Sequence, residues 1–419
     1  MKYKRKLFER ELKLKLGLSL FFALIINVSM SAQSLRRFLV EAEKNSPALK
    51  RIQLEVEQTL EAENEVGSLP NTLIDFGYFL SETETRVGPQ RARAGISQSF
   101  PWFGALKAKR ESVIYESNAK ADLFNHAKRE LFFKIKIAYY QLYAHRRRHT
   151  VVTEHIETVK LHEKSALQAL ETGKASAVDV LKIDIEKKNL EEQLKRHENL
   201  GEASKINFNI LLNREEDVEI MVPLDQLIDL NLLKYNKHLI ANNPKLVQYD
   251  NLGKSVEKLG EAAKKEGLPE IKVGLDYVLV EELPQVGLID NGKDIIIPKV
   301  QLSLPLFSKK YKAKEKRLKI KKEELMAMKE EVENELKIAY ELVYSKLTNA
   351  VNAINTYRES IKQVVQTEKL LLATYETGNV DFNAIIDIQK LKLEYEFKLI
   401  DAEYQFFEQR SIIELITQD

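Results

Sequence analysis

Apolar positions repeat with a helical period over two very long stretches of the chain. From Leu336 to Tyr375 they are spaced alternately by four and three residues, the heptad pattern of helices that pack side by side. Subtracting 205 from these residue numbers gives the positions from Leu131 to Leu170, which follow the same heptad spacing. Even the polar residue that interrupts the pattern is repeated, as Glu368 and Glu163. Residues 105–172 contain no Pro or Gly, so we expect one helix of about 100 Å there.

The apolar period changes from helical to two in four shorter stretches, which predicts β-strands. The strands are expected at approximately Leu73–Leu80, Ala92–Phe100, Ile271–Val280 and Ile295–Leu304. The first pair is expected to form a hairpin joined by the polar segment Ser81 to Arg91. Pro101-Trp102-Phe103 ends the second strand and Pro305-Leu306-Phe307 ends the fourth, and these prolines would stop ladder pairing and redirect the chain.

A Glu-Thr-Gly turn follows each long helical stretch and precedes another helix. The turn occurs at Gly173 and again at Gly378, and Gly suits a helix C-terminus. Ser176 with Asp179 three residues later predicts a capping box for the first returning helix, and Asp381 would cap the second. Each turn is therefore the predicted tip of an antiparallel helical hairpin.

The chain is thus two repeats of one plan. Each repeat has a helix, a β-hairpin and a long helical hairpin, and Ser46-Pro47 in the first matches Asn243-Pro244 in the second. The first helix should run from Leu35 to about Val66, and the first returning helix should reach about Leu212. We assign residues 33–224 to the first repeat and 225–419 to the second, with residues 213–243 as the connector.

Composition adds a secretory signal and excludes several classes of protein. Residues 1–32 combine a basic start, an apolar run from Leu16 to Val28 and small residues before Ala32, which is typical of a cleaved signal peptide. An uncleaved anchor helix would need a longer apolar run. The chain has no Cys, and 65 basic against 63 acidic residues give a net charge of +2, so no nucleic acid partner is expected.

Four strands of membrane-spanning length cannot close a barrel, and lipid does not tolerate an open sheet edge. Other copies of the chain are therefore expected to complete the sheet. Eight strands from a dimer would fill their interior with side chains, whereas twelve from a trimer leave a lumen. The alternative is a soluble two-stranded flap packed on helices.

This order of signal, duplicated hairpins and Gly-containing tips resembles the TolC family of trimeric outer-membrane efflux channels over essentially all of residues 33–419. The resemblance implies a mainly α-helical chain whose trimer forms a 12-stranded β-barrel in the outer membrane of a Gram-negative bacterium, continuous with a periplasmic α-helical barrel. It implies an exit duct of a tripartite efflux or type I secretion system, with a periplasmic adaptor and an inner-membrane pump as partners. The family has no catalytic residues and no cofactor.

The resemblance also suggests site residues. Counted from the tip glycines, the family's periplasmic gate falls on Asp179, Tyr375 and Asp387, and its adaptor contacts fall on the tips, at Gly173, Ser176, Gly378 and Asp381. An Arg that family members place two residues after the second Gly is Val380 here, so one charged gate link is missing. Pro101, Trp102 and Pro305 mark the junction between barrel and helices, where Trp102 would lie at the membrane interface or simply pack.

The remaining polar motifs support no enzyme. His145 and His149 have the spacing of metal ligands on one helix face, but no third ligand is evident and Arg146 to Arg148 lie between them. The Arg run is expected to be a solvated helix face. No phosphate-binding loop or nucleophile motif occurs. The alternative to a channel is a secreted coiled-coil scaffold or adhesin without a pore.

Overall fold

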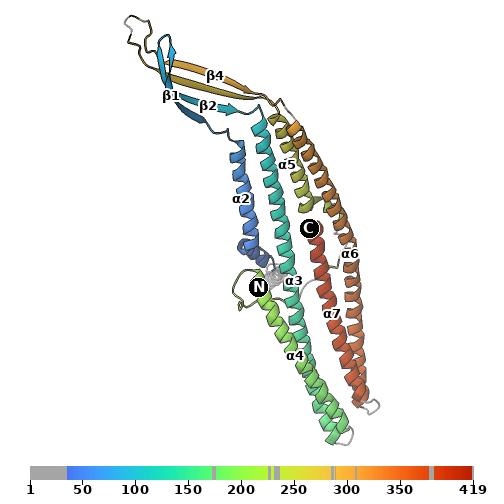
Figure 1. The fold of residues 1–419 in the computed structure, drawn as a ribbon. Helices are drawn as coiled ribbons and strands as arrows, with labels where there is room; N and C mark the ends of the chain where they lie inside the picture. The colour runs from blue at the N-terminus through green and yellow to red at the C-terminus, as the bar shows by residue number, and fades with distance from the viewer. Residues whose placement is uncertain are drawn as a thin grey trace, which may run out of the picture. The chain divides into compact units, whose positions relative to one another are not determined.

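The computed structural model describes residues 35–171, 176–224, 228–230, 236–284, 287, 289–306, 309–376 and 382–417. The expected signal peptide, both tip glycines and Asp381 lie outside these residues. Figure 1 shows the described chain as long helices and a sheet, which has four strands. Its fold is mainly helical with a small antiparallel sheet, as the sequence predicts.

The helices begin and end close to the predicted positions. A helix over residues 35–45 is followed, after a break at Ser46, by α2 (Pro47–Gly67). The long hairpins are α3 (Ala105–Glu171) with α4 (Ala177–Leu211), and α6 (Lys309–Glu376) with α7 (Phe382–Thr417). The 3₁₀ helix η1 (Lys237–Asn242) precedes α5 (Pro244–Glu266). No helix among the described residues is both long and apolar enough to cross a bilayer.

The sheet has the order β1-β2-β3-β4, and each neighbouring pair is antiparallel. Its strands are β1 (Leu73–Thr85), β2 (Gly88–Phe100), β3 (Glu270–Val280) and β4 (Ile295–Ser303). The central pair joins the two repeats, because β2 belongs to the first and β3 to the second. The four predicted strands are confirmed.

The predicted loop from Ser81 to Arg91 is wrong, because β1 and β2 continue through most of it to a two-residue turn at Arg86 and Val87. A register shift between Tyr78 and Thr83 interrupts the pairing, which hides the alternation from a pattern search. After the turn Gly88 has φ +129°, and a Cβ there would lie 1.8 Å from the Glu281 carbonyl oxygen. Only Gly fits this close approach.

The structure divides into two compact units, and each takes segments from both repeats. Among the described residues, one unit contains those within 35–49, 126–243 and 335–417, and so holds the ends of α3 and α6 and the whole of α4 and α7. Its core includes Val152, Ile183, Leu190, Ile385 and Ile400 from α3, α4 and α7. The predicted seam is confirmed in α6 as well, where Leu347 and Ile354 are fully buried.

The second unit contains residues 50–125 and 244–334, and so holds the whole sheet with α2, α5 and the starts of α3 and α6. Small side chains dominate its helix packing. Ala105, Ala108, Ala262 and Ala263 are buried, and the buried hydroxyls of Ser112 and Ser255 lie 3.0 Å apart between α3 and α5.

Candidate functional site

One face of the sheet is apolar across all four strands. The register brings Ile74 of β1 beside Ile96 of β2, then Leu275 of β3, then Pro298 of β4. The neighbouring rows on this face are also mostly apolar and most of their side chains are exposed; they comprise Phe76, Ala94, Tyr277 and Ile296, and Gln98, Val273 and Val300. Phe76 is 82% exposed and Val300 is 78% exposed, so this chain alone leaves a large apolar surface uncovered.

The opposite face of the sheet is polar at its centre. Asp276 is only 2% exposed and forms ion pairs with Arg93 and Lys299 from the two adjacent strands. Gly95 lies between Asp276 and Asp75 in the ladder, and a Cβ at Gly95 would lie within 3 Å of carboxylate oxygens of both. The sheet therefore has one apolar face and one polar face. This division is typical of transmembrane β-strands, whose apolar residues face lipid and whose polar residues face water.

The sheet has two free edges among the described residues, because β1 pairs only with β2 and β4 pairs only with β3. Pro101 directly follows β2, and Pro305 follows β4 by two residues. Trp102 is half-buried and its ring packs edge-on against Phe103 at 6.1 Å, while Phe103 is 81% exposed. The predicted interfacial role of Trp102 stays a prediction.

The end of the first helical hairpin carries the predicted cap. Ser176 and Asp179 form a capping box at the start of α4: the Asp179 backbone N–H donates to Ser176 Oγ at 3.3 Å, and the Ser176 N–H donates to the Asp179 carboxylate at 3.0 Å. Lys182 of α4 also donates to the Asn383 side chain of α7 at 2.7 Å. The beginnings of the two returning helices are thus held together in one chain.

The expected gate residues have different surroundings. Tyr375 is partly buried and packs against the core formed by α3, α4 and α7. Asp387 is exposed on α7. The Asp179 carboxylate already accepts two hydrogen bonds from Ser176, so its capping role is confirmed. The gate role of these three residues stays a prediction.

The histidines form a cluster that the sequence pattern did not reveal. The ring of His145 on α3 lies 6.2 Å from that of His197 on α4, and both ring nitrogens of the buried His197 lack a hydrogen-bond partner. Burial, followed by the nearby Arg148, lowers the pKa of His197 to about 4. In the part of the chain that the structure describes, no group of three metal-ligating side chains is placed to hold an ion. His197 and His145 lie on different helices, and the periodicity of apolar residues along the sequence does not show which helices pack together.

The Arg run beside these histidines is only partly a solvated face: Arg146 is exposed as predicted, whereas Arg147 and Arg148 are half-buried. Arg146 donates to the Val222 carbonyl in the connector at 2.9 Å. Arg148 forms an ion pair with Asp401 on α7. Both tie α3 to segments far away in the sequence.

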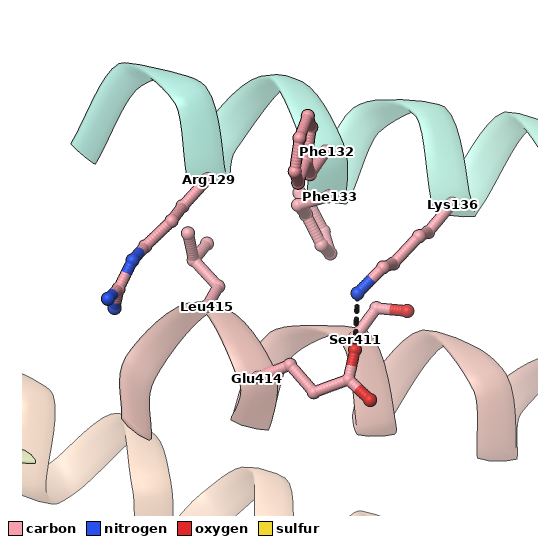
Figure 2. Close-up of a pocket in the computed structure, with 7 residues that line it drawn as sticks. All are labelled: Arg129, Phe132, Phe133, Lys136, Ser411, Glu414 and Leu415. Atoms are coloured by element: carbon pink, nitrogen blue, oxygen red, sulfur yellow. Dashed lines mark hydrogen bonds and ion pairs between the residues drawn. The ribbon is translucent and has the colours of Figure 1, made fainter. Parts of the chain in front are cut away.

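A small pocket lies between α3 and α7. Figure 2 shows Arg129 and Lys136 projecting from α3 toward α7, where Lys136 forms an ion pair with Glu414 beside Ser411. Its volume is about 120 Å³, far below that of a typical ligand site. We assign it no ligand.

A scan of protein-family models and a search of curated proteins found no match. Solved structures do match. The outer membrane protein VceC from Vibrio cholerae is 14% identical with a TM-score of 0.72, over 92% of this chain and 96% of that chain. The open-state MtrE outer membrane channel of Neisseria gonorrhoeae is 14% identical with a TM-score of 0.71, over 92% and 88%. The CmeC outer membrane channel of Campylobacter jejuni is 12% identical with a TM-score of 0.68, over 92% and 85%. The chain therefore has the fold of TolC-like outer-membrane channels.

Proposed function

We propose that this protein is an outer-membrane exit duct, which passively conducts substrates from a periplasmic adaptor and an inner-membrane pump to the outside. The observation that carries the proposal is the apolar sheet face on a chain whose fold matches outer-membrane channels over 92% of its length. A secreted scaffold without a pore would have no use for a sheet whose exposed face is apolar, because such a face favours lipid. No enzymatic step is part of the proposal.

Three copies of the chain would form the channel. The free edges of β1 and β4 need partners in lipid, because unsatisfied backbone groups there are costly. Three copies supply twelve strands, enough for a water-filled lumen lined by the polar face with Asp75, Arg93, Asp276 and Lys299. The helical hairpins would then extend into the periplasm of a Gram-negative bacterium.

The hairpin ends are the proposed adaptor contacts, at residues 172–179 and 377–383. Each segment connects the two long helices of a hairpin, α3 with α4 and α6 with α7, and Ser176 with Asp179 fixes the start of α4. The proposed gate joins Tyr375 to Asp179, and a ring of Asp387 carboxylates would line the lumen. A Tyr hydroxyl donating to a carboxylate is a charge-assisted hydrogen bond, worth about 1.5–3 kcal/mol.

Membrane insertion and conductance test the duct itself. The full chain should fractionate with the outer membrane as a heat-modifiable trimer and conduct ions in planar bilayers. Ile74→Lys or Leu302→Lys should impair assembly, at about 2–4 kcal/mol for a cation near the midplane of the lipid. Asp75→Lys on the polar face is the matched control. A trimer that never enters membranes, or normal insertion of both lipid-face variants, would refute the duct.

The tips and the gate have separate tests. Ser176→Cys and Asn383→Cys should each cross-link to an adaptor. Because the chain has no native Cys, any cross-link reports the introduced position. Cross-links from mid-helix positions alone would contradict the tip assignment. Tyr375→Phe and Asp179→Ala should each raise resting conductance, and the double variant should add little. Asp387→Ala should reduce cation selectivity, because a carboxylate ring favours cations. Parent-level conductance in assembled single variants would remove the gate.

A further inference from the structure

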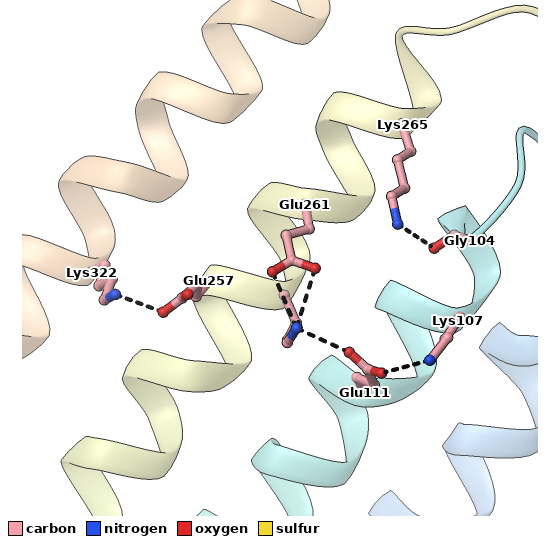
Figure 3. Close-up of polar contacts among 8 residues, drawn as sticks. Gly104, Lys107, Glu111, Glu257, Glu261, Lys265 and Lys322 are labelled. Carbon is pink, nitrogen blue, oxygen red and sulfur yellow. Dashed lines mark hydrogen bonds and ion pairs between the residues drawn. The ribbon is translucent and has the colours of Figure 1, made fainter.

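The helices beside the sheet follow one another in the order α2, α3, α5 and α6 (Figure 1). Ion pairs join each neighbouring pair of helices. Glu63 of α2 lies 3.5 Å from Arg110 of α3, Glu266 of α5 lies 2.7 Å from Lys109 of α3, and Glu257 of α5 lies 2.7 Å from Lys322 of α6. Figure 3 shows the α3–α5 and α5–α6 contacts. The Lys258 amino group forms ion pairs with Glu261 of its own helix and with Glu111 of α3, both at 3.1 Å. The two outer helices, α2 and α6, each have one flank without such a neighbour among the described residues.

The free flank of α2 is acidic. Residues 55–65 contain five Glu and no Lys or Arg. Glu57, Glu61 and Glu65 are exposed and four residues apart, so they form one stripe along the helix. Glu63, which pairs with α3, lies two residues from Glu61 and from Glu65, or about 200° around the helix. The stripe therefore faces away from α3, and none of its three carboxylates has a cationic partner among the described residues.

The free flank of α6 is basic. Residues 309–322 contain nine Lys or Arg and one Glu, whereas the matching segment of the first repeat, residues 105–118, contains three basic and two acidic residues. All three of those basic residues have carboxylate partners, Glu111, Glu266 and Glu63. On α6, Lys309, Lys312 and Lys316 are exposed and have no carboxylate partner in the described chain.

Most of the basic stripe of α6 lies opposite the residue that pairs with α5, and the side chains of Lys312 and Lys316 also border a shallow hollow shared with residues 256–264 of α5. Lys314 pairs with Glu266 of α5 at 2.7 Å. Lys312 and Lys316 each lie two residues from Lys314, or about 200° around α6. The Glu stripe and the Lys stripe thus lie on the two outer helices of one four-helix row, and each is exposed to a neighbouring copy.

The two stripes also lie at the same level below the sheet. The register places the start of β1 and the end of β4 at the same end of the sheet. The segment Glu55–Glu65 precedes Leu73, the first residue of β1, by 18 to 8 residues (73 − 55 and 73 − 65). The segment Lys309–Lys319 follows Ser303, the last residue of β4, by 6 to 16 residues (309 − 303 and 319 − 303).

We infer that the Lys stripe of α6 binds the Glu stripe of α2 in a second copy of this chain. This inference rests on the proposed function, because a head-to-tail ring of copies pairs the free edge of β4 with the free edge of β1 of the next copy. That pairing brings the adjacent helices together at the level of the two stripes. Exposed ion pairs add little stability one by one, whereas complementary stripes select the partner and its register.

A charge exchange in the full chain tests the contact. One variant carries Glu57→Lys, Glu61→Lys and Glu65→Lys, and another carries Lys309→Glu, Lys312→Glu and Lys316→Glu. Each places like charges opposite one another, so the trimer fraction measured by native mass spectrometry in detergent should fall at least tenfold at low salt. Combining both sets restores opposite charges and should return the trimer fraction to within about threefold of the parent.

A matched control and two opposing results sharpen the experiment. Lys188→Glu, Lys195→Glu and Lys362→Glu change the net charge equally at exposed positions away from the sheet and should leave the trimer intact. A combined variant that assembles no better than either triple variant overturns the contact. If the α6 variant instead loses bound phosphatidylglycerol in nanodiscs and α2 exchange gives no rescue, the stripe binds lipid and the inference is wrong. A parent chain that forms no trimer at all rejects the proposed function, a separate failure.

Discussion

The two helical hairpins share one packing seam and one cross-helix ion pair, but they differ in their histidines. Glu163 of α3 lies 2.8 Å from Lys187 of α4, and Glu368 of α6 lies 3.6 Å from Lys392 of α7, with an offset of 205 at both residues. Each hairpin therefore has a cross-helix ion pair at the same level. Such a pair opposes slippage of one helix along the other, because a shift in register separates the charges.

Six of the seven histidines occur in the first repeat, and the seventh, His238, lies in the connector. All seven precede α5, and the positions in the second hairpin that match His145, His149 and His197 are Ala350, Ile354 and Ala402. His149 has a side chain 43% exposed, while Ile354 is fully buried. A common seam therefore fixes the fold of both hairpins. Burial differs at the pair His149 and Ile354, whereas His197 and Ala402 are both buried.

The largest expected difference comes from truncating this matched pair. Ile354→Ala should lower the free energy of unfolding by about 3–4 kcal/mol, because it leaves a cavity in a closed core. His149→Ala should change it by less than about 0.5 kcal/mol, because the side chain is partly solvated. Thermal melts followed by circular dichroism measure both. Equal losses would mean that the two positions are buried alike.

Acid should weaken the first hairpin selectively. The pKa of His197 is about 4 in the folded chain and 6.5 in the unfolded chain, so the neutral form stabilises the fold above pH 6.5. As the pH falls from 6.5 to 4 the unfolded chain binds a proton that the folded chain does not, and up to about 3 kcal/mol is lost. His145, His149, Arg148 and Arg196 add repulsion to a charged His197.

Hydrogen exchange measured between pH 7.5 and 5, corrected for intrinsic rates, locates this acid effect. Opening should increase in α3 and α4 before α6 and α7, and His197→Leu should remove most of the difference. The charge-preserving control is Arg196→Lys, which keeps the local cation. An equal increase in both hairpins would show that His197 does not control the response.

The capping box gives a smaller effect at the end of the first hairpin. Ser176→Ala removes the acceptor of the Asp179 N–H and should cost about 1 kcal/mol, whereas Ser176→Asn should keep most of the cap. If the second hairpin uses Asp381 as predicted, Asp381→Ala should cost about the same. A much smaller loss there would show a different cap in the second repeat.

The smallest expected difference concerns the paired charges of the two seams. Double-mutant cycles of Glu163→Gln with Lys187→Gln, and of Glu368→Gln with Lys392→Gln, should give couplings of the same sign and similar size. A coupling in one hairpin alone would break the equivalence of the two repeats.

The sequence by itself determined the elements, because heptad spacing, strand alternation and helix caps depend on residues within a few turns of each other. The seam from Leu336 to Tyr375, the four strands, and the cap of Ser176 with Asp179 were all predicted in this way. The sequence also indicated the repeat and, through it, the fold of an outer-membrane channel.

Tertiary structure alone decided which elements meet. Three contacts show this: β2 pairs with β3, His145 contacts His197, and Arg148 forms an ion pair with Asp401. The residues that meet are separated in the sequence by 52 positions for the histidines (197 − 145) and by up to 253 for the ion pair (401 − 148). The continuation of β1 past Leu80 depended likewise on the register with β2. No local period records such partners, because burial and pairing are set by the neighbour across the contact, and that neighbour is chosen by the packing of the whole unit.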